Sequence, residues 1–200
     1  MDFEHARHYA IERLTHELAS ELTYHSIWHT RDDVVPSVEL LARHSDVTGD
    51  DLVLLRTAAY YHDIGFIERR DEHEAIGVRI AAATLPDYGY TSDELQIISG
   101  IIMSTRLPQS PHTLLEQLLA DADLDVLGRT DFLQRNQALR AELACYGTIV
   151  SDATWYRSQI QFLNQHHYCT TAATELRHAG KQHNLATLQK LLGEAHPSAG

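Results

Sequence analysis

Apolar residues recur at helical spacing along almost the whole chain, and this regularity restricts the possible folds more than any other feature. No stretch alternates with a period of two for long enough to predict a strand. The pattern therefore predicts an all-α protein in which Pro36 kinks or offsets the second helix. The expected helices cover residues 2–22, 27–45, 50–64, 72–85, 92–104, 112–127, 131–146, 152–167 and 170–193.

Nothing in the 200 residues marks a boundary between domains. The connections between the expected helices are short and polar, and each holds a glycine, a proline or a helix-capping residue. No internal repeat, low-complexity segment or flexible linker interrupts them, and a chain of this length can bury one sizeable core. We therefore expect a single helical domain over residues 1–200, with a frayed tail at 194–200.

The composition restricts the expected partners and compartment. A formal net charge of −12 argues against a nucleic-acid polymer and against an anionic membrane surface, since both require basic clusters. No apolar run is long enough to span a bilayer, and the N-terminal stretch MDFEHARHYAIE is charged throughout, unlike a signal peptide. Cys145 and Cys169 do not suggest a disulfide framework, so a reducing cytoplasm is expected. Small-molecule chemistry is favoured.

Histidine is the one unusual count, with fourteen in the chain. The histidines of the C-terminal third lie among polar residues, and we expect most of them to be solvated. They are His166, His167, His178, His183 and His196.

The stretch AAYYHDIGF, residues 58–66, places His62 beside Asp63 at the end of an apolar run. We expect a helix that packs into the core and stops at Gly65 on a left-handed cap. A carboxylate buried there without a partner would cost several kcal/mol. Asp63 is therefore expected to be paired, protonated or bound to a cation.

Three other stretches offer ligands for such a cation. In YHSIWHTRDD, His25 and His29 are four residues apart and project from one face if the segment is helical. In ERRDEHEAIG, the apolar residues that follow at helical spacing place His73 on an inward face. In LLADADLDVLG, three aspartates stand along an otherwise apolar helix: Asp121, Asp123 and Asp125. Two histidines and two carboxylates at one point suit Mn, Fe, Co, Ni or Zn, and such a site can activate water.

The helical face selects among the three aspartates. Asp123 falls at the edge of the buried arc, with Leu119 and Leu127 one turn to either side. The residues four positions from Asp121 are polar, so its carboxylate is expected to point to solvent or to a loop. We therefore expect Asp123 to be the ligand, with Asp121 as the alternative.

The ordered set resembles the HD superfamily of metal-dependent phosphohydrolases. The resemblance lies in His29, the dyad His62-Asp63 between AAYY and IGF, and the aspartate of DADL. It covers a core of about 24–132, which the helices of 131–193 follow. In that family an H…HD…D set binds the metal. The resemblance therefore implies an HD-type helical bundle with His29, His62, Asp63 and Asp123 as ligands of a divalent ion, Mg included.

Further roles follow from the resemblance. The pair in YHSIWH is similar to the H-x-x-x-H of cyclic nucleotide phosphodiesterases, which implies His25 as the general acid and His29 as a ligand. Asp63 is expected to bridge to the attacking water. His73 resembles the additional ligand of dinuclear members, but ISGIIMSTRLP lacks the histidine that many of them have there, so a second metal stays open. Arg106 in this stretch is a candidate contact for a phosphate oxygen.

Several of these residues also have ordinary structural explanations. His25 would equally suit a capping or packing position, His73 a solvated position in RRDEHE, and Arg106 the surface. Asp33, four residues after His29, is expected either behind the ligands or in solvent. Glu116, two turns before Asp123 on the same face, is likewise expected either behind the ligands or in solvent.

The residues and the resemblance together predict a phosphohydrolase that acts on a small-molecule phosphate ester. The resemblance points to a nucleotide or a cyclic nucleotide. Two alternatives stay open. One is a di-iron oxygenase of the HD type, and the other is a ligand-binding or regulatory domain whose metal is structural.

Overall fold

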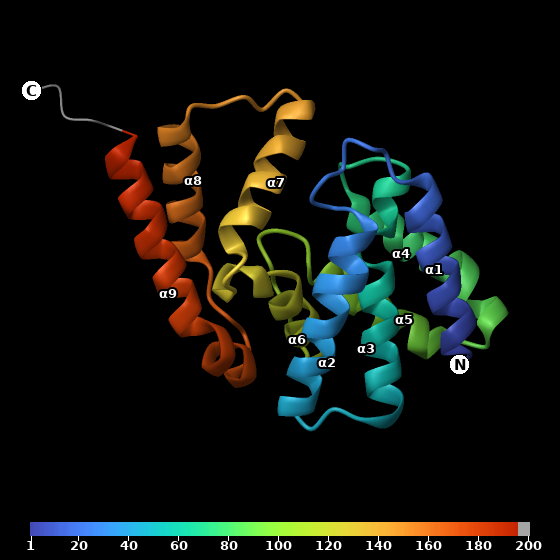
Figure 1. The fold of residues 1–200 in the computed structure, drawn as a ribbon. Helices are drawn as coiled ribbons and strands as arrows, with labels where there is room; N and C mark the ends of the chain where they lie inside the picture. The colour runs from blue at the N-terminus through green and yellow to red at the C-terminus, as the bar shows by residue number, and fades with distance from the viewer. Residues whose placement is uncertain (196–200) are drawn as a thin grey trace, which may run out of the picture.

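The computed structural model describes residues 1–195, and every regular element in that range is helical (Figure 1). All the expected helices are present, so the all-α prediction is confirmed. The α-helices are α1 (Phe3–Glu17), α2 (Val35–His44), α3 (Gly49–Tyr61), α4 (His73–Thr84), α5 (Ser92–Met103), α6 (Leu114–Asp123), α7 (Phe132–Cys145), α8 (Asp152–Gln165) and α9 (Thr171–Glu194). Of the tail expected at 194–200, only residues 194 and 195 are described, and Glu194 is the last residue of α9. The rest of the tail, with His196, lies outside the described residues.

Short helices of other types join several of these elements. A π-helix, η1 (His29–Val34), runs directly into α2. Three 3₁₀ helices are η2 (Ile64–Ile67), η3 (Leu85–Tyr88) and η4 (Asp125–Gly128). Pro36 is the second residue of α2, directly after η1, and it has no N–H to donate to the carbonyls of η1. It therefore marks the offset between η1 and α2.

The chain around Gly65 differs from the sequence prediction. Helix α3 ends at Tyr61, His62 caps it, and Gly65 lies inside η2 and is not left-handed. The prediction of a left-handed cap is therefore wrong. Glycine is required for a different reason, because a Cβ at this position would collide with the backbone carbonyl of His73. That close approach brings the start of α4 against the dyad.

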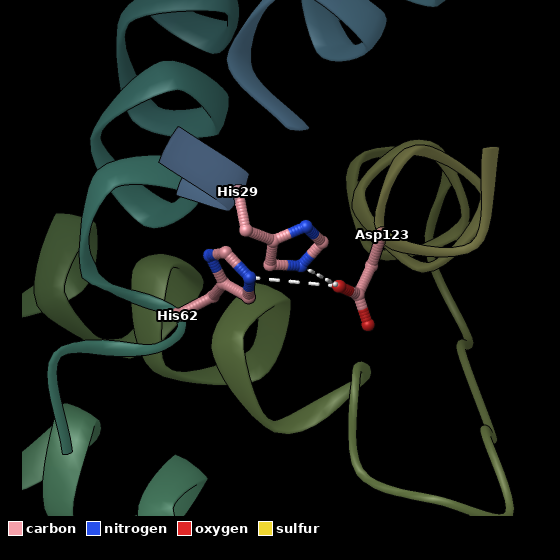
Figure 2. A group of neighbouring side chains, drawn as sticks. All are labelled: His29, His62 and Asp123. Atoms are coloured by element: carbon pink, nitrogen blue, oxygen red, sulfur yellow. Dashed lines mark hydrogen bonds and ion pairs between the residues drawn. The ribbon is translucent and has the colours of Figure 1, made fainter. Parts of the chain in front are cut away.

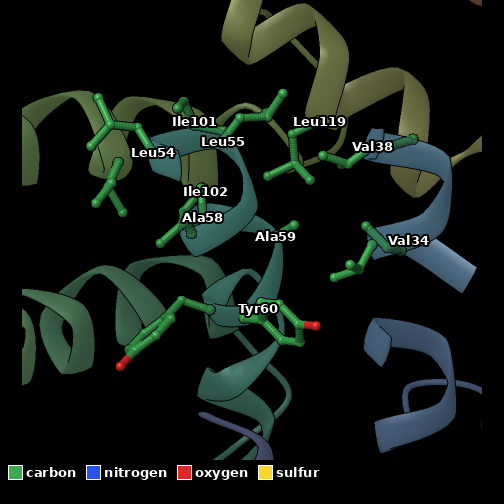
Figure 3. Close-up of a cluster of buried hydrophobic side chains, with 14 of the residues drawn as sticks. Val34, Val38, Leu54, Leu55, Ala58, Ala59, Tyr60, Ile101, Ile102 and Leu119 are labelled. Carbon is green, nitrogen blue, oxygen red and sulfur yellow. The ribbon is translucent and has the colours of Figure 1, made fainter. Parts of the chain in front are cut away.

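Helix α3 lies at the centre of the larger apolar core and contacts α1, α2, α5 and α6. Figure 3 shows its side chains surrounded by those of the neighbouring helices. Leu55, Ala58 and Ala59 have no exposed surface, and small alanines let the partner helices approach closely. The packing holds the C-terminal end of α3, and with it His62, in a fixed place.

The last three helices form a separate layer. Figure 1 shows α7, α8 and α9 side by side, with α2 and α6 between them and the helices α1, α4 and α5. A second apolar cluster, centred on Leu127, Phe132, Leu163 and Leu188, holds this layer together. Although α9 has 24 residues, no described helix is both long and apolar enough to cross a membrane.

The two layers meet closely where α9 crosses η4. A Cβ on Gly180 of α9 would collide with the backbone of Gly128 in η4. Because η4 follows directly after α6, this contact ties α9 to the helix that carries the DADL aspartates.

We predict that Gly180→Ala destabilises the protein by about 1–3 kcal/mol, because a backbone contact cannot yield as a flexible side chain would. The matched control is Gly193→Ala in the same helix, where an added Cβ meets nothing within 4 Å. That change is expected to be neutral or stabilising by up to about 1 kcal/mol. Urea unfolding measures both. Equal effects at the two positions would show that the contact between α9 and η4 does not limit stability.

Candidate metal centre

Side chains from three separate elements converge at the C-terminal end of α3 (Figure 2). Asp123 Oδ1 lies 3.2 Å from His29 Nε2 and 3.5 Å from His62 Nε2. The potential ligand atoms of these three residues all lie within 4.8 Å of one another. Asp63 Oδ2 joins them at 3.3 Å from His62 Nε2 and 3.8 Å from His29 Nε2. The four predicted ligands are thus neighbours in space.

Local structure fixes the direction of each side chain. His62 Nδ1 lies 2.8 Å from the carbonyl of Ala59 and donates to it, which leaves Nε2 as the nitrogen that faces the carboxylates. His29 begins the π-helix, whose wider turn buries both His29 and Asp33. Asp123 is the last residue of α6.

Two polar atoms at the centre of the group have no hydrogen-bond partner. His62 Nε2 and Asp63 Oδ2 are close but not aligned as donor and acceptor, and both are buried. Buried polar atoms are costly unless they are hydrogen-bonded, paired or coordinated. A divalent cation would satisfy both, and a mixed set of imidazole and carboxylate donors fits such an ion. The residues present therefore fit a metal. Within residues 1–195, no second group of three or more potential ligands lies as close together.

In setting the pKa values of this group, attraction between opposite charges outweighs the effect of burial. Burial acts to lower the pKa of His62, but Asp63 and Asp123 hold that pKa well above its ordinary value. Burial acts to raise the pKa of Asp63 and of Asp123, yet His62 and His29 hold both well below the usual range. The histidines therefore favour their protonated forms, and a cation that binds them must displace protons.

Asp33 lies behind His29, one of the two positions expected for it. Its Oδ2 is 3.7 Å from His29 Nδ1, and its carboxylate forms ion pairs with Arg129 and Arg135. Arg135 also stacks over Trp28, with 4.3 Å from its guanidinium carbon to the ring centroid. The sequence did not single out either arginine, although Arg129 belongs to the DADLxxLGR stretch. Together they hold Asp33 in place against His29.

The three aspartates of DADLD, residues 121–125, have different environments. Both oxygens of Asp121 are engaged, by the backbone N–H of Cys169 at 2.7 Å and by the N–H and hydroxyl of Thr170 at 2.8 and 2.7 Å. Its side chain points to the segment before α9, as expected for a loop, but the expectation of solvent is wrong because Asp121 is 1% exposed. Asp125 binds Ser37 and Arg177. Asp123 alone of the three faces the histidines.

Glu116 lies away from this group. Helix α6 begins at Leu114, so Glu116 is its third residue and forms a capping box with Thr113. Its carboxylate also accepts the backbone N–H of His112 at 2.6 Å. Of the two positions expected for Glu116, the one beside the ligands is wrong, because the N–H groups at the start of the helix bind this carboxylate.

His25 lies in a bend before η1 and not on a helix, with its ring centroid 6.0 Å from that of His29. Its Nδ1 is 2.5 Å from Oε1 of Glu142, which comes from α7. Glu142 has no exposed surface and also accepts the backbone N–H groups of Tyr24 and His25. The hydrogen bonds from His25 outweigh burial and lower the pKa of Glu142. Sequence reasoning missed Glu142, since no local signal joins residues 117 positions apart.

His73 lies near the Asp63 oxygen that faces away from His62. His73 Nε2 is 3.5 Å from Asp63 Oδ1 and 3.6 Å from Glu74 Oε1. The rings of His73 and His25 both stack on Phe66, with centroid distances of 4.1 and 4.5 Å. His73 is thus next to the predicted ligands and not in the solvated position that its charged neighbours also allowed.

A cavity of about 770 Å³ opens from this group toward α7 and α8. Asp63, Asp123, His25 and His73 line its inner end, and Arg106, which is exposed, also lines it. The walls toward the C-terminal layer combine apolar with polar side chains: Leu124, Leu127, Phe132, Leu139 and Phe162 with Arg135, Asn136, Ser158 and Gln159. The site is therefore open to a ligand that has an organic part.

The family model of the HD domain matches residues 34–125, a little under half of the chain. The matched segment holds His62, Asp63 and Asp123, while His29 precedes it and Glu142 follows it. Searches of curated proteins and of solved structures found no match.

We predict that Asp123→Asn and Asp121→Asn separate the metal site from the fold. Asp123→Asn removes a charged donor and is expected to lose bound metal by elemental analysis while the chain stays helical by circular dichroism. Asp121→Asn is expected to keep the metal and to lower the free energy of unfolding by about 1–3 kcal/mol, because two backbone N–H groups lose a charged acceptor. Metal loss in the Asp121 variant together with retention in the Asp123 variant would contradict the assignment.

Proposed function

Because the chain is an HD-domain protein, we propose that it is a metal-dependent phosphohydrolase that cleaves a small-molecule phosphate ester. The observation that carries the proposal is the buried group of His29, His62, Asp63 and Asp123, with its unpartnered donor atoms at the end of a large cavity. These four residues would hold the cation, for which Mn, Fe, Co, Ni, Zn and Mg are candidates. A nucleotide or a cyclic nucleotide is the proposed substrate class.

A divalent cation held there would lower the pKa of a water molecule and polarise a phosphoryl oxygen. The residues of the chain supply the rest. Asp63 has one oxygen toward the histidines and the other 3.5 Å from His73 Nε2, so it would orient the attacking water by accepting a hydrogen bond. The buried surroundings strengthen each of these electrostatic contacts.

His25 is the proposed general acid. Since its Nδ1 is bound to Glu142, Nε2 remains to give a proton to the oxygen that leaves. Glu142 would hold the imidazole in one orientation, because its buried carboxylate accepts the hydrogen bond of Nδ1. Phe66 supports the other side of the ring, at a centroid distance of 4.5 Å. His25 is thus a positioned acid with one free nitrogen.

The cavity walls suit an anionic ester with an organic group. Arg70 and Arg106 add positive charge along a cavity that Asp71, Glu72 and Glu74 also line, and a phosphate accepts hydrogen bonds from guanidinium groups. The apolar wall formed by Phe132, Leu139 and Phe162 would cover the organic part of the substrate. This part of the site comes from the C-terminal layer, beyond the segment matched by the HD family.

The test of this function is hydrolysis by purified protein loaded with Mn, Ni or Co, using 4-nitrophenyl phosphate and a panel of mono- and cyclic nucleotides. We predict hydrolysis that a chelator abolishes and that added metal restores. Bound metal without hydrolysis of any ester would contradict the proposal and favour a regulatory domain. Metal-dependent oxygen uptake without hydrolysis would favour the oxygenase.

We predict that His25→Ala keeps its metal and lowers the hydrolysis rate by roughly 10²–10⁴-fold, the usual contribution of a general acid. Esters with poor leaving groups should suffer most, because they depend on protonation of the departing oxygen. His183→Ala, an exposed histidine on α9, is the matched control and should retain the wild-type rate. An unchanged rate of His25→Ala on a poor-leaving-group ester would contradict the assigned role.

A further inference from the structure

A second cavity, of about 210 Å³, lies between α8 and α9. Its buried surface includes His166 and Lys181, and its exposed rim includes Asn164, His178 and Gln182. No aspartate or glutamate is among the described residues that line it. In a chain with a formal net charge of −12, a cavity lined by lysine and histidine without any carboxylate is unusual. Its charge points to a negatively charged ligand.

Lys181 is 6% exposed and has only neutral partners. Its Nζ donates to the backbone carbonyl of His166 at 2.5 Å and lies 3.2 Å from Nδ1 of the same residue. Within residues 1–195, no carboxylate lies within ion-pair distance of Lys181, whereas Arg177, one turn earlier on α9, is paired with Asp125 at 2.7 Å. A buried ammonium group without a counter-ion is costly.

The hydrogen bonds of Lys181 also fix the proton on His166. An ammonium group has three donors and no acceptor, so His166 Nδ1 must accept and Nε2 must carry the proton. His166 is 9% exposed, and its Nε2 is buried without a partner among the described residues. His166 is therefore an exception among the C-terminal histidines, most of which are expected to be solvated. Burial and the charge of Lys181 lower the pKa of His166 to about 4, which keeps the imidazole neutral as this arrangement requires.

We propose that this cavity is a binding site for a small oxyanion of the size of phosphate. The third N–H of Lys181, whose Nζ the two contacts with His166 hold in place, is the donor that it would bind, and the ammonium charge would supply the counter-charge. The volume of about 210 Å³ accommodates such an ion with water. The site is separate from the metal centre and does not rest on the proposed hydrolysis. Free inorganic phosphate and the phosphate group of a small metabolite share this chemistry.

Binding would also stabilise the C-terminal layer. Leu163 lines the small cavity and belongs to the apolar cluster of Leu127 and Phe132, which line the large one. An anion that joins the end of α8 to α9 would therefore raise the unfolding temperature of the whole layer, since it binds the folded chain only.

The experiment measures the unfolding temperature of the metal-free full chain against inorganic phosphate, with chloride keeping the ionic strength constant. A saturable rise is expected for the wild type. Lys181→Met should weaken phosphate affinity roughly ten- to hundredfold, the loss expected for a charge-assisted hydrogen bond. Lys190→Met, which removes the same charge from an exposed position of α9, is the matched control and should bind as the wild type does. Asp123→Asn should also bind as the wild type does, which separates this site from the metal centre.

A second variant covers the case in which Lys181→Met does not fold. His166→Phe removes both ring nitrogens, keeps the backbone carbonyl that Lys181 binds, and should likewise weaken phosphate binding. Parallel titrations with sulfate and glycerol 3-phosphate show whether the site prefers a free oxyanion or the phosphate group of an organic molecule. Equal binding of sulfate supports any tetrahedral oxyanion, and preferred binding of glycerol 3-phosphate supports an organic phosphate. The proposal would be overturned if none of the three anions gave saturable stabilisation. It would also be overturned if every variant that folds, Lys181→Met or His166→Phe, kept the phosphate affinity of the wild type.

Discussion

The structure depends on four ionisable side chains, three of them buried, where α3, η1 and α6 meet. His29, His62 and Asp63 are at most 4% exposed, and Asp123 completes the group. Their mutual attraction reduces the cost of removing charge from water, but His62 Nε2 and Asp63 Oδ2 are left without hydrogen bonds. The apolar core around α3 fixes this arrangement in place. A rigid site with unsatisfied donor atoms is what a cation requires.

The C-terminal layer completes the site from outside the segment matched by the HD family. Glu142 of α7 binds His25, and the apolar side chains of α7 and α8 form the far walls of the large cavity. Asp121 and Asp125, on either side of Asp123, bind Thr170 and Arg177 at the start of α9. The DADLD stretch thus provides one residue to the candidate metal centre and two that attach the last layer.

The sequence predicts features that depend on local periodicity. Helical spacing gives every helix, and the helical face distinguishes Asp123 from Asp121. Features that depend on tertiary contacts are missed or wrong. Glu142 pairs with a residue 117 positions away, and Gly65 is required by the approach of α4, not by the end of a helix. His166 lies in a polar stretch, yet packing between α8 and α9 buries it. Local patterns identify faces of helices but not the partner that a face meets.

The most direct measurement is anomalous X-ray diffraction from crystals of the protein soaked in Mn²⁺. The account predicts one strong anomalous peak surrounded by His29 Nε2, His62 Nε2 and the carboxylates of Asp63 and Asp123. Data collected above and below the manganese absorption edge identify the element. A crystal that binds manganese elsewhere, with these four side chains satisfied by one another or by water, would contradict the account.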